Sequence, residues 1–251
     1  MLHEAKELER LKINARDGNL GYVYDFYFDD LKWITRYLVV DTGNWLTGRR
    51  VLISPHSINK PDYDKKELAV NLDKEQIVDS PHISEDEPIS QQHQKVLADY
   101  YGWPIYWSVD PALNAMGAME MSKEKNKEGD PHLRSIREVR NYNIEATDGN
   151  IGYVENFIID DENWDIKYLI LDTRKWMHWL PGGEYILITP GLIDKIDWAA
   201  SNVYIKLDKE TIKNAPVYET KKQIDNKFEY KLYEWMKEFI DDTKEHSTLL
   251  K

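Results

Sequence analysis

The chain has 251 residues, and 33 Lys and Arg stand against 45 Asp and Glu, which gives a formal net charge of -12. This charge disfavours nucleic acid and anionic lipid as partners, because the field of the molecule repels phosphate. The absence of cysteine excludes disulfides, thiolate catalysis and Cys-ligated metals. No signal peptide and no run of roughly 20 apolar residues is found, so the sequence predicts a cytoplasmic protein without a transmembrane segment.

An internal repeat organises the chain. Ala15 to Leu46 aligns with Ala146 to Met177 at a shift of 131, and half of these 32 positions are identical. After a four-residue insertion in the second copy the shift becomes 135, which aligns VLISP at 51–55 with ILITP at 186–190. Identity at this level is typical of a duplication, so we expect two copies of one structural unit.

Turn motifs and β-prone runs predict the strands of each copy. Asp17-Gly-Asn19 and Asp148-Gly-Asn150 tolerate the positive φ that a tight hairpin turn needs. Runs rich in aromatic and β-branched residues follow. The expected strands are 20–28, 37–40, 50–53 and 68–72 in the first copy, and 151–159, 166–171, 185–188 and 203–207 in the second. Short strands without helices between them predict a small antiparallel β-barrel in each copy, which leaves no exposed sheet edge.

A helix is expected after the strands of each copy. The first, Gln91 to Tyr101, ends at Gly102. The second carries an apolar stripe that repeats at steps of three and four residues, typical of an amphipathic helix, and we expect this stripe to pack within the chain. The stripe consists of Ile224, Phe228, Leu232, Trp235 and Phe239.

These elements predict a mainly β protein of two tandem small antiparallel β-barrels, each followed by a helix. The first unit covers residues 1–108, and the second covers 132–251. Residues 109–131 contain a polar run without periodicity and are predicted to be a linker.

Longer motifs carry a family resemblance. The first copy contains DGNLGYVYDFYFDD, YLVVDT, VLISP and DSPHISEDEPISQQHQ, and the second contains LRS at 133–135, DGNIGYVENFIIDD, YLILDT, WLPGG, ILITP and NAPVYE. This pattern resembles the PRC-barrel family, named for the cytoplasmic domain of the photosynthetic reaction centre H subunit and shared with a ribosome maturation factor. The resemblance implies tandem PRC-type barrels and a binding or adaptor role, since the best-known members dock against other proteins. The membrane-spanning helix of the H subunit and the N-terminal domain of the ribosome factor have no counterpart in this sequence.

Carboxylates at strand ends are the candidates for acid–base chemistry or cation binding. They are Asp29, Asp30 and Asp41 in the first copy and Asp160, Asp161 and Asp172 in the second. Because Asp is also a common turn former, and both copies keep these residues at the same strand boundaries, the structural interpretation is favoured.

Metal motifs receive little support from the sequence. Asp161, Asn163, Asp165 and Asp172 match positions 1, 3, 5 and 12 of a calcium loop. Position 6, which needs glycine, is Ile166, so we interpret this match as coincidental. The seven histidines show no pairing that would place two imidazoles on one metal, and no nucleotide-binding or nucleophile motif is found.

Aromatic residues are unusually abundant, with 9 Trp and 16 Tyr. Such residues are enriched at protein interfaces. The candidate interface residues are Trp103, Trp107, Trp176, His178, Trp179 and Trp235. The alternative, which we favour, is that these aromatics join the two barrels or seat the helices.

The sequence therefore predicts a non-enzymatic binding or adaptor protein with an unidentified protein partner, no cofactor and no metal. Three alternatives stay open. The chain could bind a small molecule or cation, or be an enzyme, with a carboxylate-lined cleft between the barrels. It could be an accessory protein of a photosynthetic or other energy-coupling membrane complex, which only the resemblance suggests. It could also form a homo-oligomer.

Overall fold

The computed structural model of this chain describes residues 1–46, 48–59, 61–81, 91–105, 132–174, 184–220 and 224–240, without the side chains of 91 and 92. The described residues are mainly β and form two sheets, one in each of two compact units. We name residues 9–135 the first-copy unit, and residues 1–8 together with 136–251 the second-copy unit. The predicted linker, 109–131, lies outside the described residues.

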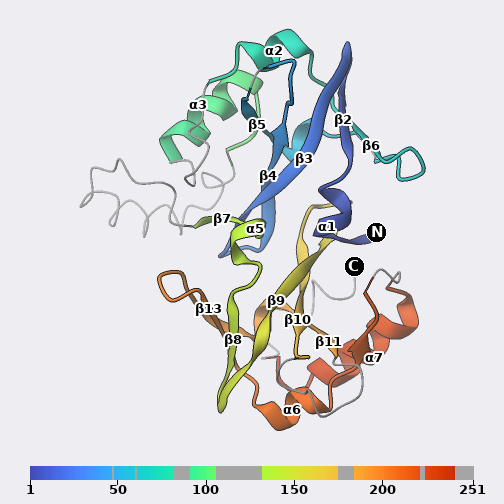
Figure 1. The fold of residues 1–251 in the computed structure, drawn as a ribbon, viewed down its shortest axis with the longest axis vertical. Coiled ribbons are helices and arrows are strands. Elements are labelled where there is room, and N and C mark those ends of the chain that lie inside the picture. The colour runs from blue at the N-terminus through green and yellow to red at the C-terminus, as the bar shows by residue number, and fades with distance from the viewer. Residues whose placement is uncertain are drawn as a thin grey trace. The chain divides into compact units, whose positions relative to one another are not determined.

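The first-copy unit contains a six-stranded sheet in the order β5-β4-β3-β2-β6, with β7 also paired to β3 (Figure 1). Its strands are β2 (Lys12–Ala15), β3 (Gly18–Asp29), β4 (Ile34–Asp41), β5 (Arg50–Ile53), β6 (Glu67–Ala69) and β7 (Leu133–Ser135). Its helices are the 3-10 turn η1 (Pro55–Ser57), α2 (Lys74–Val78) and α3 (Gln91–Tyr101).

The second-copy unit repeats this plan with an eight-stranded sheet in the order β12-β13-β8-β9-β10-β11-β14, with β1 also paired to β9. Its strands are β1 (Leu2–Glu4), β8 (Asn143–Ala146), β9 (Gly149–Asp160), β10 (Ile166–Asp172), β11 (Tyr185–Ile188), β12 (Ile193–Asp197), β13 (Asn202–Ile205) and β14 (Val217–Tyr218). Its helices are α1 (Ala5–Leu8), α5 (Ile136–Val139), the 3-10 turn η3 (Pro190–Leu192), α6 (Lys209–Lys213) and α7 (Asn226–Met236).

The prediction of purely antiparallel pairing does not hold throughout, because β2 pairs with β6 and β8 pairs with β13 in parallel. The other ladders of both sheets are antiparallel. Parallel pairing needs a long crossover, and here the crossover is the run of strands between β2 and β6, or between β8 and β13.

Two strands are exchanged between the copies. In the repeat, β1 precedes the first copy and β7 precedes the second, yet β1 pairs with β9 and β7 pairs with β3. The registers agree: Leu2 opposes Asp160 as Leu133 opposes Asp29, each pair related by the shift of 131. Each sheet is therefore completed by the segment that precedes the other copy. The predicted first unit, 1–108, differs from the observed one in this respect.

The turn that follows each long strand contains a tryptophan in a left-handed conformation. Trp33 has φ 55° and Trp164 has φ 64°, and these residues are equivalent in the repeat. Each tryptophan donates its backbone N–H to the backbone carbonyl of the aspartate that ends the strand. The N···O distance is 2.7 Å from Trp33 to Asp29 and 2.8 Å from Trp164 to Asp160. Positive φ is uncommon for a bulky side chain, so both turns hold the tryptophan against its local preference.

Both predicted helices are present. Helix α3 has the predicted bounds, and α7 buries Leu232 and Met236 within its own unit. Ring contacts continue along α7, where Phe228 faces Tyr218 and Trp235 faces Phe239. Packing of the stripe within the chain is thus confirmed for its central part. No helix among the described residues is long and apolar enough to cross a membrane.

Candidate functional site

The two aspartates at the end of β3, and the two at the end of β9, differ in the contacts that they make. The first member closes the turn: Asp29 accepts the backbone N–H of Leu31 and of Lys32, at 3.0 and 3.1 Å, and its other oxygen pairs with Arg36 at 2.9 Å. Asp160, its equivalent, accepts the backbone N–H of Glu162 at 3.2 Å, and it also accepts a hydrogen bond from the Met1 amino group at 3.3 Å. The contacts with backbone N–H groups are those of an Asx turn, as the structural interpretation predicts.

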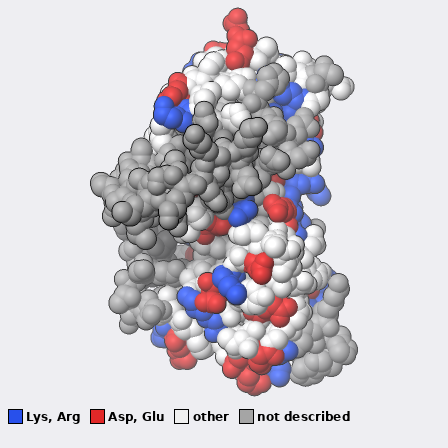
Figure 2. All heavy atoms as spheres, turned by 90° about the vertical axis from the view of Figure 1, so that its left-hand side faces the viewer, with Lys and Arg blue, Asp and Glu red and all other residues white. Residues whose placement is uncertain are grey.

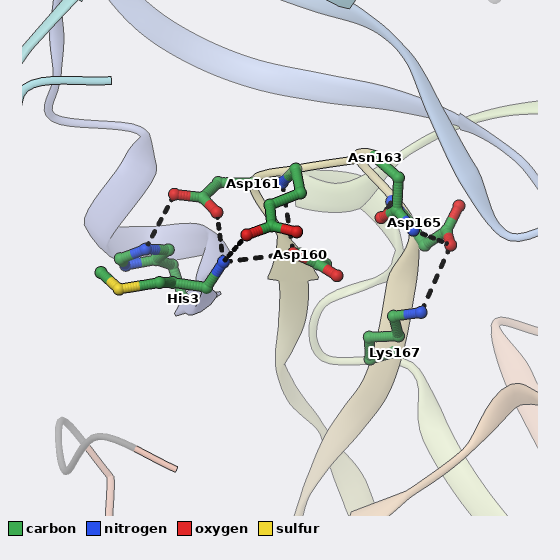
Figure 3. A network of polar contacts seen from close by, with 8 residues as sticks. His3, Asp160, Asp161, Asn163, Asp165 and Lys167 are labelled. Carbon is green, nitrogen blue, oxygen red and sulfur yellow. Dashed lines mark hydrogen bonds and ion pairs between the residues drawn. The ribbon is translucent and has the colours of Figure 1, made fainter. Parts of the chain in front are cut away.

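The second member of each pair faces the exchanged strand. In the first-copy unit, Asp30 lies 3.0 Å from Nδ1 of His132 and 3.5 Å from Nε of Arg134. In the second-copy unit, Asp161 contacts the amino group of Met1 and lies 3.3 Å from Nε2 of His3 (Figure 3). The backbone N–H of each aspartate also donates to the exchanged segment, Asp30 to His132 and Asp161 to Met1. We call these contacts the outer clasp of each unit.

Burial and charge act in opposite directions on the second-copy clasp. Burial lowers the pKa of His3, and the carboxylate of Asp161 offsets this only in part. Burial also acts to lower the pKa of the Met1 amino group, but hydrogen bonds and charge from Asp161 and Asp160 outweigh it, so this pKa is raised. The clasp therefore favours a charged amino group beside a neutral imidazole.

A second polar contact lies deeper along each exchanged strand. In the second-copy unit, Glu4 accepts hydrogen bonds from Nδ2 of Asn156 and from the hydroxyl of Tyr218, both at 3.0 Å. In the first-copy unit, the hydroxyl of Ser135 donates to Asp25 at 2.5 Å. Ser135 is the repeat equivalent of Glu4, and Asp25 is the equivalent of Asn156. We call these contacts the inner lock of each unit.

The third pair of candidate carboxylates differs between the copies. Asp41 is exposed and accepts the backbone N–H of Gly43 at 2.9 Å. Asp172 is buried and accepts hydrogen bonds from Arg174 and from the hydroxyl of Tyr153, the latter at 2.6 Å. Burial acts to raise the pKa of Asp172, but these hydrogen bonds outweigh it and the pKa is lowered. The Arg174 guanidinium also lies over the Tyr185 ring, 4.8 Å from its centroid.

The residues of the calcium-like match interact with one another. Asn163 donates to Asp165 at 2.6 Å, and the ammonium of Lys167 lies 3.4 Å from the same carboxylate (Figure 3). The carboxylate of Asp165 is therefore engaged by two side chains of the same segment. Among the residues that the structure describes, no group of three or more His, Asp or Glu side chains could hold a metal ion.

Of the aromatic candidates, the structure describes Trp103 and Trp235. Trp103 is buried, stacks on Tyr101 at 4.3 Å and donates its indole N–H to Ser57 at 2.7 Å. These contacts seat the end of α3 in the first-copy unit. Trp235 is half-buried on α7 and keeps a partly exposed ring. The remaining candidates, Trp107, Trp176, His178 and Trp179, lie outside the described residues.

Comparison with models of known protein families gives no match, and no curated protein matches the chain.

The exchanged strands themselves were not predicted from the sequence. Leu2-His-Glu4 and Leu133-Arg-Ser135 share one identity in three, which is too weak a signal to reveal an exchanged strand. The signal that could have found them is the spacing: each triplet stands 13 residues before the Asp-Gly-Asn turn of its own copy. Sequence position cannot say which of two equivalent sheets such a strand joins.

Proposed function

We propose that this chain is a cytoplasmic, non-enzymatic protein-binding or adaptor protein built from two PRC-type β-barrel units. One observation carries the proposal: each unit takes up a strand from outside its own copy and holds it by backbone pairing, an outer clasp and an inner lock. Addition of a strand to a sheet is a common mode of protein recognition, in which main-chain hydrogen bonds give affinity and side chains give specificity.

The state of the carboxylates supports the same proposal. Asp29 and Asp160 hold turns, Asp30 and Asp161 hold exchanged strands, and Asp172 is engaged by an arginine and a tyrosine. A general acid or base needs a carboxylate that can reach a substrate proton, and a cation site needs several that converge. The described contacts of these aspartates are structural instead.

The distribution of charge supports a protein partner over a phosphate backbone. On the face drawn in Figure 2, Lys and Arg side chains lie among Asp and Glu side chains in the coloured, described part of the surface. Nucleic-acid binding needs a continuous basic stripe to overcome a net charge of -12. A surface of mixed charge with half-exposed aromatics is more typical of protein contacts.

The surface that we propose for the partner is the flank of α7 around Trp235. This ring contacts Phe239 at 5.8 Å in an edge-on geometry and stays partly exposed, while Leu232 and Met236 anchor the helix beneath. An aromatic side chain on a well-anchored helix offers a large rigid contact area.

The test is affinity purification of the tagged chain from its source cell, with Trp235→Ser compared with Tyr230→Ser. Tyr230 is 66% exposed on the same helix and serves as the matched control. We expect one protein to be recovered in near-stoichiometric amount with the unaltered chain and the control, and to be lost with Trp235→Ser, while thermal melting shows all three folded. Recovery of no such protein, together with substrate turnover that Asp172→Asn abolishes, would refute the proposal in favour of an enzyme.

A further inference from the structure

The inner locks are equivalent in position but different in chemistry. In each unit, the last residue of the exchanged strand forms a hydrogen bond with a residue of the long strand. Glu4 opposes Ile158 in the ladder and contacts Asn156, two positions earlier. Ser135 opposes Tyr27 and contacts Asp25, also two positions earlier. Glu4, Asn156 and Asp25 are buried, with 7%, 0% and 4% of their surface exposed. The second-copy lock therefore pairs a carboxylate with an amide, and the first-copy lock pairs a hydroxyl with a carboxylate.

In the alternative pairing, each exchanged strand would pair with the sheet of its own copy. This pairing would bring unfavourable combinations of side chains into contact. Because the two ladders share one register, β1 on β3 would bring Glu4 against Asp25. Two carboxylates in contact at a buried position repel each other and disfavour ionisation, which destabilises this pairing. The same change would place Ser135 against Asn156 and would deprive Asp25 of the hydroxyl that donates to it.

The outer clasps cannot distinguish between the two exchanged strands. Both offer an aspartate, Asp30 or Asp161, and both strands bring nitrogen groups toward it. The second-copy unit adds a further element of selection, because the Tyr218 hydroxyl also donates to Glu4. At the shift of 135 the first-copy equivalent of Tyr218 is residue 83, an isoleucine without a hydroxyl, which lies outside the described residues.

We propose that the inner locks decide which strand each sheet accepts. The end of β9 selects a strand whose third residue is a carboxylate, through the amide of Asn156 and the hydroxyl of Tyr218. The end of β3 selects a strand with a small hydroxyl side chain, through the carboxylate of Asp25. Asn156 and Asp25 are specificity-determining residues for strand exchange, whether or not the chain binds another protein.

The first test is a double-mutant cycle in the full chain, read as thermal midpoint. Asn156→Asp places a carboxylate against Glu4 and should lower the midpoint by about 5–10 °C. Adding Glu4→Ser recreates the Asp–Ser lock of the other unit and should restore most of the loss. Asn143→Asp makes the same chemical change on an exposed strand position and should alter the midpoint by no more than about 2 °C. Additive effects of Asn156→Asp and Glu4→Ser would overturn the proposal.

The second test runs the cycle in the opposite direction, in case the first variant fails to fold. Ser135→Glu brings a carboxylate against Asp25 and should be destabilising, and Asp25→Asn should rescue it by recreating the Glu–Asn lock. If Asp25→Asn gives no rescue, the locks do not select by charge.

The third test determines whether β1 pairs with β9 or with β3. Since the chain has no cysteine, introduced pairs report strand pairing directly. His3→Cys with Ile159→Cys, which oppose each other across the ladder, should form a disulfide in the unaltered background. In the Asp25→Asn/Asn156→Asp background this disulfide should be lost, and His3→Cys with Phe28→Cys should form one instead. Persistence of the 3–159 disulfide in that background would show that chain connectivity, and not the inner locks, decides the exchange.

Discussion

Gly21 and Gly152 occupy equivalent positions where two backbones approach too closely for any side chain. A Cβ atom on Gly152 would lie 2.0 Å from the carbonyl oxygen of Asp172, and one on Gly21 would lie 1.9 Å from that of Asp41. Both glycines also have φ above 130°, where other residues are strained. The close approach lets β3 and β9 pass tightly against the next strand of each sheet.

We predict that Gly152→Ala lowers the free energy of unfolding by roughly 3 kcal/mol or more, because the backbone of β9 or β10 must shift. The measurement is urea unfolding. Gly43→Ala is the matched control: it also has positive φ, 59°, but no atom lies within 4 Å of the added Cβ. It should cost only about 1–2 kcal/mol. Equal losses in the two variants would contradict a role for the close approach.

His3 gives the chain a pH-dependent contact at the outer clasp. Its pKa is lowered from the ordinary value of 6.5, chiefly by burial, against the opposing charges of Asp161 and Glu7. The unfolded chain therefore takes up the proton more readily, so the contribution of His3 is fully present above pH 6.5 and is lost as the pH falls through the folded pKa.

The prediction is that the free energy of unfolding decreases less between pH 7.5 and 5.5 in His3→Gln than in the unaltered chain. Denaturant titration at the two pH values provides the measurement. His56→Gln makes the same chemical change at an exposed position away from the clasp and is measured alongside. A decrease of the same size in His3→Gln would mean that other groups set the pH dependence.

At the scale of elements, helix α7 depends on two fully buried side chains. Leu232 and Met236 have 0% and 1% of their surface exposed, whereas Phe228, Trp235 and Phe239 are half-buried. Most of the helix's binding energy to its sheet should therefore come from this pair, and not evenly from the predicted stripe.

Leu232→Ala should lower the free energy of unfolding by about 2–5 kcal/mol, through lost burial and the cavity left behind. Tyr230→Ala, on the exposed side of the same helix, controls for helix propensity and should change stability by less than about 0.5 kcal/mol. Chemical unfolding followed by tryptophan fluorescence measures both. A small effect of Leu232→Ala would indicate that α7 contributes little to the fold.

The strands with the strongest local signals were predictable from sequence. The bounds of β5, β11 and α3 agree with prediction, because each is a compact run flanked by clear breakers. The short helices α2 and α6 were missed, since five residues carry too little periodicity, and their first residues are held by the hairpin aspartates Asp17 and Asp148 far away in sequence. Local patterns cannot reveal such tertiary caps.

The sequence was enough to single out the aspartates of the candidate site, but not to show which contacts each of them makes. The sequence singled out the aspartates at the strand ends and favoured a structural interpretation, which the turn contacts of Asp29 bear out. It could not show that Asp30 and Asp161 hold exchanged strands, because those partners lie more than 100 residues away. Asp25 and Asn156 lie within the repeated motifs but were not singled out, and Glu4 lies in no motif, since single polar residues acquire meaning only when a strand pairing places them together.

At the scale of the whole molecule, each unit combines parts of the chain that lie on both sides of residues 109–131. The second-copy unit needs residues 1–8, and the first-copy unit needs 133–135. A cut anywhere in 109–131 would leave each unit with part of its sheet on the other fragment.

We therefore predict that the two fragments stay together after cleavage at a protease site inserted behind Lys125. Size-exclusion chromatography without denaturant should give one peak that contains both fragments, at the position of the uncut chain. The same cut in a chain with Leu2→Pro and Leu133→Pro, which disrupt both exchanged strands, should release the fragments more readily. Separation of the unaltered fragments under native conditions would be inconsistent with the exchange.

The exchanged strands also fix the order of events during synthesis. Glu4 leaves the ribosome 152 residues before its partner Asn156, an interval on the order of ten seconds at ordinary rates of translation. For most of that time the nascent first copy lacks β7, and β1 lacks the second-copy strand β9 with which it pairs. An open strand edge in a growing chain invites contact with neighbouring chains. The exchange leaves the β3 edge open until β7 has been made, and it leaves β1 without its partner strand until β9 has been made.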